Sequence, residues 1–405
     1  MKKLTLFAFF DALGWEVYRH YGFMKNRVKD ARALETVFGF SSAADPSILT
    51  GAYPEEHQHW SSFFYAPESS PFKSLKMLAH LPQRLVNRWR VRHQLSKLLA
   101  KLYGFTGYFE MYSVPFKALP YFDYLEKHDY FVPGGIISGT TMFDQLLAAN
   151  VPYHCSNWRK SEAACREDLK AEIRKGEIAF AYLYQPRLDG LMHNVGTRHP
   201  SVKAKLQEYE RELEAILELA ETHYDEVAFY AFSDHGMTDV VGTVDLISPV
   251  DAAMRAQGFT YGEDYVAMYD STMARFWFPN PHSASAVKDH LGKVLATFEV
   301  AGQGAPVSAQ QLKDWHCDFS DHRFGEWIFL LSPGWLITPS YMGLNAIPGM
   351  HGYDPAHADS KAFLISNRPI PEHVKSITDL RSIMVKEVLE GSPKTSDKLL
   401  EVTLR

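Results

Sequence analysis

The sequence predicts an α/β protein in which helices cover both faces of a mostly parallel central sheet, with further segments inserted between the strands. Short apolar runs alternate with longer amphipathic stretches, as in Ile178–Tyr184, Ser201–Thr222 and Val227–Phe232. Buried parallel strands have this apolar character, and a strand, helix, strand order favours a right-handed parallel crossover. A hydrophobic content of 46% over 405 residues allows one large domain with insertions, or two domains.

The first buried strand is expected at Leu4–Phe10, followed by Asp11 and a helix over about Trp15–Met24. Lys2 and Lys3 precede this run as they would in a signal peptide, but the run is short and no small-residue cleavage site follows it. Ligands of open parallel sheets bind at the carboxyl ends of strands. Asp11 is therefore the first candidate site residue.

A second short strand is expected at Thr36–Phe40, and it leads into Ser41, Ser42 and a short helix. A helix N-terminus stabilises an anion or an ionised nucleophile, which makes either serine a candidate nucleophile. Alternatively, one of these serines is simply the N-cap of the helix, a common position for serine.

Residues 53–135 form an irregular, aromatic-rich insertion in which Ser62, Phe63 and Tyr65 are candidate substrate-binding residues. The stretch Leu81–Tyr103 within it predicts a basic helix without acidic residues. Its apolar positions fit one helix face, namely Leu81, Leu85, Leu95, Leu98, Leu99 and Leu102. The pattern is typical of a solvated helix packed on a core; a lid over an anionic substrate and a patch facing acidic lipid headgroups are the functional alternatives.

Two pairs of acidic and imidazole side chains follow later strands. Asp189 and His193 are four residues apart after Ile178–Tyr184, so a helical turn would place both on one face, where they could chelate one ion. Asp234 and His235 directly follow Val227–Phe232. The alternatives are a helix N-terminus with a dipole-favoured Asp189 and a capping turn at Asp234.

The pattern changes to shorter alternating strands after about residue 250. Met273–Phe278 and Trp327–Leu331 are expected strands around a helix at Ala284–Phe298, and Ala362–Ser366 is the expected last strand, after His351. Strand and helix are also expected at Val151–Cys155 and Ser161–Arg174. Residues 1–250 with 346–405 are thus predicted to form the α/β core, and residues 251–345 a smaller α+β cap.

Composition narrows the possible functions. A net charge of -6 argues against binding of nucleic-acid polymers. The three cysteines form no CxxC pair, which favours a reducing, cytoplasmic location. No stretch is apolar for long enough to predict a transmembrane segment, and no pattern indicates an oligomeric state.

The candidate residues collect at the predicted carboxyl edge of the sheet. They are Asp11, Ser41 or Ser42, Asp189, His193, Asp234, His235 and His351. This set is large enough for two divalent metal ions; mixed nitrogen and oxygen ligation suits zinc, with manganese possible and calcium disfavoured. A serine hydroxyl bridging two such ions would ionise near neutral pH and attack phosphorus.

The chain resembles the alkaline phosphatase superfamily, and within it the nucleotide pyrophosphatase/phosphodiesterase branch. Five short segments carry the resemblance, in the family's order: Phe10–Leu13, Leu49–His57, Tyr184–His193, Phe232–Met237 and Gly349–Asp354. The resemblance implies that Asp189, His193 and His351 hold one metal and that Asp11, Asp234 and His235 hold the other. It places the nucleophile on Ser41, with Ser42 as the neighbouring possibility, where the branch usually has threonine.

The chain departs from the family pattern in two places. The asparagine that supports the oxyanion in many members is missing from Trp60–Phe63, and the Asn-His pair after the nucleophile is replaced by Ala44 and Asp45. Both departures concern transition-state stabilisation and nucleotide specificity. Sulfatases are disfavoured, because Ser41–Asp45 lacks their Pro and Arg.

The resulting hypothesis is a two-metal hydrolase of phosphodiester or phosphoanhydride bonds, acting on a nucleotide, a nucleotide-sugar or a phosphodiester headgroup. A phosphomonoesterase or phosphotransferase of the same superfamily is one alternative. The other is a catalytically silent homologue that binds metal and acts as a binding module.

Overall fold

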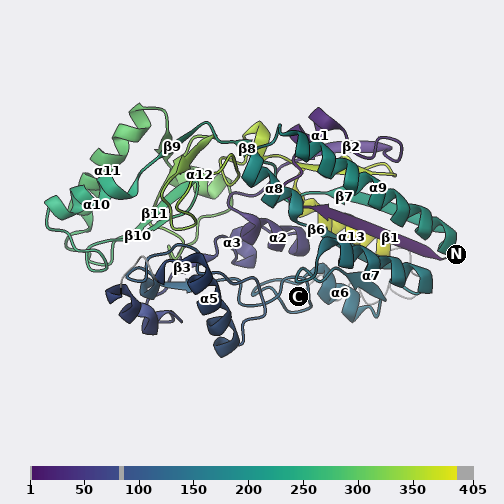
Figure 1. Ribbon diagram of the computed structural model, residues 1–405, viewed down its shortest axis with the longest axis horizontal. Helices are drawn as coiled ribbons and strands as arrows, with labels where there is room; N and C mark the ends of the chain where they lie inside the picture. The colour runs from purple at the N-terminus through teal and green to yellow at the C-terminus, as the bar shows by residue number, and fades with distance from the viewer. Residues whose placement is uncertain (1, 82–85, 390–405) are drawn as a thin grey trace.

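A six-stranded sheet with the order β2-β16-β7-β1-β6-β5 forms one half of the molecule (Figure 1). The computed structural model describes residues 2–81 and 86–389. The strands of this sheet are β1 (Lys3–Phe10), β2 (Asp30–Leu34), β5 (Tyr153–Cys155), β6 (Phe180–Gln185), β7 (Glu226–Phe232) and β16 (Ala362–Ser366). β1 lies inside the sheet and pairs in parallel with both β6 and β7.

The sequence predicted a mostly parallel sheet. The sheet is mixed, and it differs from that expectation at one edge. β5, β6, β1 and β7 pair in parallel, whereas β16 is antiparallel to both β7 and β2. The chain before β16 lies at the carboxyl ends of the parallel strands, because Gly236 donates to Ser360 O and Trp15 donates to Lys361 O. β16 starts at that edge and must therefore run backwards.

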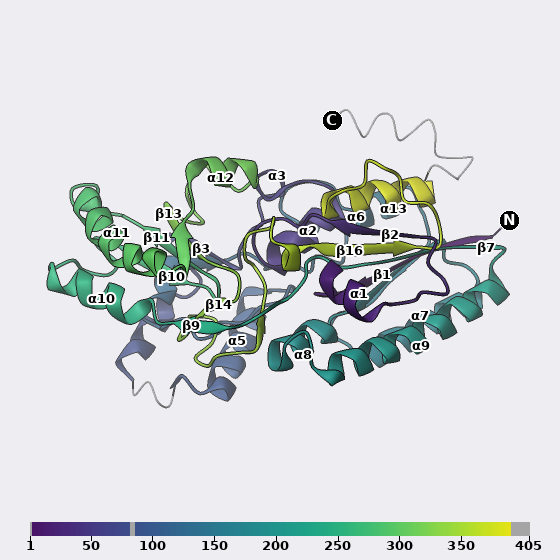
Figure 2. The ribbon, with the colours of Figure 1, turned by 90° about the horizontal axis from the view of Figure 1, so that it is seen from above.

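Helices cover both faces of this sheet (Figure 2). One face carries α1 (Trp15–Tyr21), α7 (Glu162–Lys175), α8 (Arg187–Val195) and α9 (Pro200–His223); the other carries α2 (Ser41–Thr50), α6 (Met142–Ala148) and α13 (Leu380–Leu389). Alternate residues of β1 enter two separate cores, with Leu6 packed among residues of α7 and α9, and Phe7 among residues of α2 and α6. Strand periodicity thus produces the two-sided sheet that the apolar runs predict.

A second, antiparallel sheet of order β10-β11-β13-β12 lies beyond the first. Its strands are β10 (Val266–Tyr269), β11 (Met273–Trp277), β12 (Gly304–Pro306) and β13 (Trp327–Leu331), accompanied by α10 (Ile247–Ala256), α11 (Ala284–Val300) and α12 (Ala309–Asp314). Its core also contains Phe63 and Phe122 from the 53–135 insertion. The insertion therefore packs on the second sheet, while the proposed division into core and cap stays a prediction.

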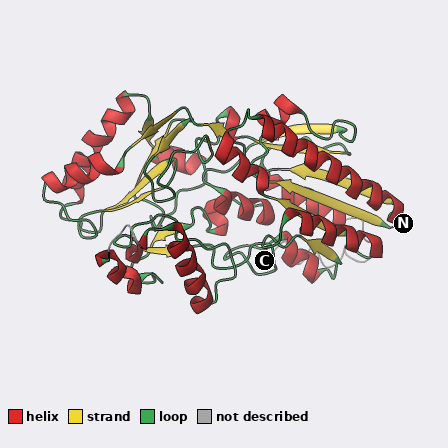
Figure 3. Ribbon diagram, viewed as in Figure 1, coloured by secondary structure: helices red, strands yellow, loops and turns green. Residues whose placement is uncertain are grey.

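Apart from helix α5, the remaining elements are short, and most lie in the loop-rich region between the two sheets and around the insertion (Figure 3). They are α3 (Pro54–His57), β3 (Phe63–Tyr65), η1 (Lys73–His80), α5 (Trp89–Tyr103), η2 (Leu119–Tyr121), β4 (Phe122–Tyr124), β8 (Thr238–Asp239), β9 (Gly242–Val244), β14 (Trp335–Ile337), β15 (Gly349–Met350), η3 (Ala358–Ser360) and η4 (Ile377–Asp379). Within the described residues, no helix has the length and hydrophobicity needed to cross a bilayer. The three cysteines are free thiols, and a cytoplasmic location stays a prediction.

The strand predicted at Thr36–Phe40 is wrong, because β2 ends at Leu34. Hydrogen bonds from side chains hold this segment instead of a strand ladder. Thr36 Oγ1 donates to the carbonyl of Asp234 (2.7 Å), and the Trp60 indole donates to Phe38 O (2.7 Å). The segment is thereby fixed against the loops at the carboxyl edge of the sheet.

The basic helix begins at Trp89 rather than at Leu81, and its predicted apolar face is only partly buried. Leu99 is buried, but Leu98 and Leu102 are 61% and 71% exposed. Leu85 lies outside the described residues. The helix packs on the core through different side chains, which are described below.

Arg275 on β11 joins the second sheet to the 53–135 insertion. Its guanidinium is fully buried and pairs with Asp270, with 2.7 Å between Nε and Oδ2. It also donates to Phe63 O (3.0 Å), Phe324 O (3.1 Å) and Ser61 Oγ (3.0 Å). One charged side chain thus satisfies backbone groups from several segments at once.

We predict that Arg275→Ala lowers the free energy of unfolding by about 3–5 kcal/mol, because Asp270 would remain as a buried charge without a partner. Thermal unfolding followed by circular dichroism measures the effect. Adding Asp270→Asn to Arg275→Ala should recover part of the loss. An unchanged melting temperature in the single variant would contradict this role.

Candidate active site

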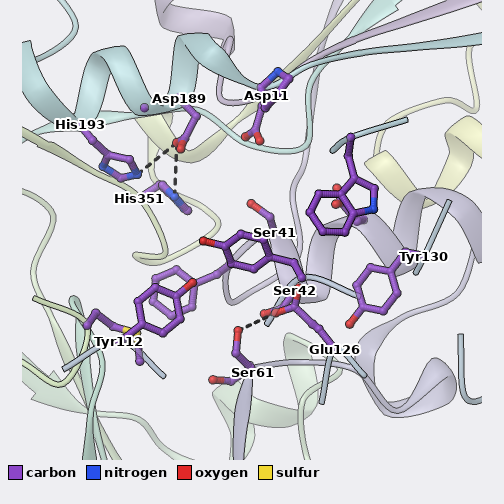
Figure 4. Close-up of a pocket in the computed structure, with 18 of the residues that line it drawn as sticks. Asp11, Ser41, Ser42, Ser61, Tyr112, Glu126, Tyr130, Asp189, His193 and His351 are labelled. Carbon is purple, nitrogen blue, oxygen red and sulfur yellow. Dashed lines mark hydrogen bonds and ion pairs between the residues drawn. The ribbon is translucent and has the colours of Figure 1, made fainter. Parts of the chain in front are cut away.

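A cavity of about 550 Å³ opens at the carboxyl ends of β1, β6 and β7. The lining residues expected from the sequence include Asp11, Ser41, Asp189, His193 and His351. Figure 4 shows that these five side chains converge on the same space from different elements. Segments far apart in the sequence therefore form one site.

The first group of potential metal ligands consists of Asp189, His193 and His351, whose ligand atoms all lie within 4.8 Å of one another. Asp189 and His193 lie on α8, where the predicted spacing of four residues places them on one face. Asp189 Oδ1 is 3.2 Å from His193 Nε2 and 3.6 Å from His351 Nε2. His193 Nδ1 is 2.8 Å from Gly349 O, so donation to that carbonyl leaves Nε2 free to bind a metal.

The second group consists of Asp11, Asp234 and His235, which also lie within 4.8 Å of one another through one ligand atom each. Asp11 follows β1 and Asp234 follows the neighbouring β7. The backbone N–H of Ala12 donates to Asp234 Oδ1 (3.2 Å) and ties the two strand ends together. His235 Nδ1 is 2.9 Å from Gly236 O, which again directs Nε2 towards the carboxylates.

Gly236 allows the loop after β7 to lie close to the segment that leads to β16. A Cβ atom at this position would lie 2.1 Å from Asp359 O. A larger residue would therefore push the loop after β7 away from the segment that leads to β16.

The two groups lie side by side. The rings of His235 and His351 stack with 3.8 Å between their centroids. Burial, together with the neighbouring His235 and His193, holds the pKa of His351 well below its usual value. Burial, together with the charges of Asp234 and Asp189, holds the pKa of Asp11 well above its usual value.

The donor set fits divalent cations. Within the described residues, Asp11 Oδ1 is buried and has no hydrogen-bond donor, while the buried Asp189 Oδ1 and Asp234 Oδ2 face imidazole nitrogens, His193 Nε2 at 3.2 Å and His235 Nε2 at 2.9 Å. Buried carboxylates held so close together are costly, and a bound cation removes that cost. The neutral imidazole of His351 is also the form that binds metals.

The two serines have different partners. Ser41 is the first residue of α2, and its Oγ is 3.2 Å from His235 Nε2. Ser42 Oγ donates to Trp60 O (3.1 Å). The N-cap of α2 is Phe40, so the alternative that either serine is the N-cap is wrong. Ser41 is therefore the hydroxyl that faces the metal-ligand groups.

The expected substrate-binding residues divide into two sets. Ser62 lines the cavity. Phe63 is fully buried in the core of the second sheet, and Tyr65 stacks on Trp277 with 5.6 Å between centroids. The pairing of β3 with β4 turns both rings away from the cavity, so neither lines it. Substrate binding by Ser62 stays a prediction, and the positions of Phe63 and Tyr65 do not support that role for them.

Other aromatic residues line the cavity instead, and sequence reasoning did not single them out. They are Phe40, Tyr108, Tyr112, Tyr130, Phe131, Trp158 and Tyr184. The aromatic density of the 53–135 insertion pointed to the correct region. It could not distinguish which rings face the cavity, because that depends on how the insertion packs on the second sheet.

Four further acids line the cavity, namely Asp45, Glu126, Asp129 and Asp270. Ser62 Oγ donates to Glu126 Oε1 (2.6 Å), and burial raises the pKa of Glu126 to about 7. Asp45 is buried, its Oδ1 has no hydrogen-bond donor within the described residues, and burial raises its pKa. No local sequence signal distinguishes Glu126 from the other acids of the insertion.

The chain belongs to the type I phosphodiesterase/nucleotide pyrophosphatase family, whose model matches residues 23–354. The resemblance found in the sequence is thereby confirmed. Among curated protein sequences no match is found.

Solved structures show the same fold. Murine ectonucleotide pyrophosphatase/phosphodiesterase 5 is similar with a TM-score of 0.65 at 16% identity, covering 95% of each chain. An inactive variant of that protein in complex with AMP gives a TM-score of 0.64 at 16% identity, again with 95% of each chain covered. The human protein gives 0.63 at 13% identity, with 95% of this chain and 94% of that chain covered.

We predict that Glu126→Gln stabilises the protein more at pH 8 than at pH 5. The folded state holds the Glu126 proton up to about pH 7, whereas the ordinary pKa is 4.5, so wild-type stability falls as the pH rises between these values. The substitution should remove a penalty of roughly 1–3 kcal/mol at pH 8. Melting temperatures of both proteins at the two pH values measure it.

The exposed Glu263 offers a matched control, since Glu263→Gln removes the same charge at the surface. An equal stability change for Glu126→Gln at pH 5 and pH 8 would contradict the raised pKa.

Proposed function

We propose that the protein is a two-metal phosphodiesterase in which Ser41 is the nucleophile. The main support is the position of Ser41 Oγ, which lies 3.2 Å from His235 Nε2 in a cavity lined by members of both metal-ligand groups. Family membership supports phosphodiesterase-type activity. The identity of the nucleophile and the number of metals rest on this geometry.

Asp189, His193 and His351 would hold one cation, and Asp11, Asp234 and His235 the other. Divalent cations bound there would lower the pKa of the Ser41 hydroxyl and offset negative charge on the phosphate oxygens. The mixture of carboxylates and imidazoles favours zinc and also accepts manganese.

The residues of the chain then have separate tasks. Ser41 Oγ forms a bond to phosphorus as the bond to the leaving oxygen breaks, and water later cleaves the phosphoserine. The N-terminus of α2, where Ser41 lies, favours the negative charge that develops on the serine and the phosphate. Gly349 O and Gly236 O hold the rings of His193 and His235 in one orientation.

Ser62 occupies the region where many family members have the supporting asparagine. Its hydroxyl donates to Glu126, so Ser62 and Glu126 would contact the substrate as a hydrogen-bonded pair. Glu126 in its protonated form can itself donate to a substrate oxygen. This pair would replace the missing amide in the wall of the cavity.

The lining of the cavity favours diesters over other phosphoryl substrates. Among the described residues that line it, none is lysine or arginine. A monoester dianion or a polyphosphate would therefore find no lysine or arginine side chain in the described lining. The aromatic rings suit a planar or apolar group, and the AMP complex of the murine protein makes a nucleotide diester a suitable first substrate.

We predict that Ser41→Ala lowers turnover of bis-p-nitrophenyl phosphate roughly a thousandfold or more while leaving two metal ions per chain. Turnover and metal content by mass spectrometry are measured on the same preparation. Ser42→Ala is the matched control and should retain most activity, because the Ser42 hydroxyl donates to the Trp60 carbonyl rather than facing the metal-ligand groups.

Full activity of Ser41→Ala would remove covalent catalysis by this residue. Two bound ions without turnover of any phosphate ester by the wild type would favour the alternative of a silent metal-binding module.

We also predict that the wild type hydrolyses bis-p-nitrophenyl phosphate at least tenfold faster than p-nitrophenyl phosphate, in kcat/KM. The monoester carries an additional charge that no lysine or arginine of the described lining neutralises. A preference for the monoester would favour the phosphomonoesterase alternative. Release of product to an added alcohol, in place of water, would favour a phosphotransferase.

A further inference from the structure

Helix α5 lies at the periphery of the molecule in both views (Figures 1 and 2). Its side chains form three lengthwise stripes, which follow from the helical repeat of 3.6 residues. The buried stripe is Arg92, Ser96 and Leu99; the apolar stripe is Val91, Leu95, Leu98 and Leu102; and the basic stripe is Arg90, Lys97 and Lys101 together with Gln94.

Polar groups dominate the contacts of the buried stripe. Arg92 donates to Tyr112 O (3.0 Å) and Val114 O (2.8 Å), and its guanidinium lies over the ring of Phe116. Ser96 Oγ donates to Glu110 Oε1 (2.8 Å). These hydrogen bonds fix α5 to the segment that supplies Tyr108 and Tyr112 to the cavity. Most leucines of α5 take no part in this attachment.

The apolar stripe is left largely in solvent. Leu98 is 61% exposed, Leu102 is 71% exposed and Val91 is 43% exposed, while Leu95 is half-buried. The spacing i, i+4, i+7, i+11 is that of a continuous apolar face. A helix that buries arginine and serine while exposing two leucines and a valine is inverted relative to an ordinary surface helix.

The basic stripe runs alongside the apolar stripe. Arg90, Lys97 and Lys101 are all exposed, and α5 contains no acidic residue. The whole chain has a net charge of -6, so this concentration of positive charge is local. An apolar stripe beside a lysine- and arginine-rich stripe is the arrangement found in helices that lie in the plane of a membrane interface.

We propose that the outer face of α5 docks the protein on an anionic phospholipid surface. Leu98 and Leu102 enter the boundary between headgroups and acyl chains, and Lys97 and Lys101 contact the acidic headgroups. Charge complementarity selects this partner over a second copy of the chain, because two copies related by a twofold axis would bring their basic stripes together. The proposal is independent of the proposed function.

The test is co-sedimentation of the full chain with phosphatidylcholine vesicles, with and without phosphatidylserine. We expect binding only to vesicles that contain phosphatidylserine, and weaker binding at high salt. Lys97→Gln and Lys101→Gln should each weaken binding about fivefold. Leu98→Gln and Leu102→Gln should each weaken it roughly tenfold.

Matched controls change the same residue types elsewhere on the surface. Lys203→Gln on α9 and Leu147→Gln on α6, where the leucine is 60% exposed, should leave vesicle binding unchanged. All variants should have the circular dichroism spectrum and the melting temperature of the wild type, which shows that they are folded.

Three outcomes would overturn the proposal. They are no binding of the wild type to phosphatidylserine vesicles, equal binding to pure phosphatidylcholine, and unaltered binding of the α5 variants. Analytical ultracentrifugation of the free protein completes the test. A wild-type dimer that the leucine variants dissociate, without any vesicle binding, would assign the apolar stripe to self-association instead.

Discussion

Three buried carboxylates held close together are the constraint on which the site depends. Asp11, Asp189 and Asp234 each place a carboxylate oxygen out of solvent, and Asp11 Oδ1 has no hydrogen-bond donor among the described residues. Repulsion between them and the loss of water raise the pKa of Asp11. The fold keeps them together because Asp11 and Asp234 end adjacent parallel strands and Asp189 follows the third strand. Such an arrangement is stable only with protons or cations, and the neighbouring imidazoles favour cations.

The surroundings of these carboxylates explain how one scaffold can hold metals and select substrates. The central sheet supplies the ligands, whereas the 53–135 insertion and the second sheet supply the cavity wall. Arg275 on the second sheet donates to Phe63 O and Ser61 Oγ of the insertion. These hydrogen bonds position Ser61 and the adjacent Ser62. Specificity can therefore change by altering the insertion without disturbing the metal ligands. The hydrogen-bonded pair of Ser62 and Glu126, which lines the cavity, lies within that insertion.

Local sequence patterns predicted most of the strands and named acidic and imidazole residues that the fold brings together in two groups. Trp327–Leu331 and Ala362–Ser366 match β13 and β16 residue for residue, because continuous apolar runs can only be buried. Asp189 and His193 were placed by helical spacing. The failures depended on long-range packing. Thr36–Phe40 is fixed by side chains from distant loops, Phe63 turns towards the second sheet, and Arg92 takes the core position that leucines were expected to fill. The antiparallel direction of β16 depends on where the preceding segment lies in the fold. A local sequence pattern cannot predict that position.

The late return of the chain has a consequence for biosynthesis. Asp11, Asp234 and His235 are all present once the first 235 residues have been made. The other group also needs His351, which is made much later, shortly before β16 pairs with β7. A nascent chain can thus bring Asp11, Asp234 and His235 together well before the other group is complete. If both groups bind cations as proposed, synthesis from the amino terminus imposes an order on their loading that refolding from the complete chain does not.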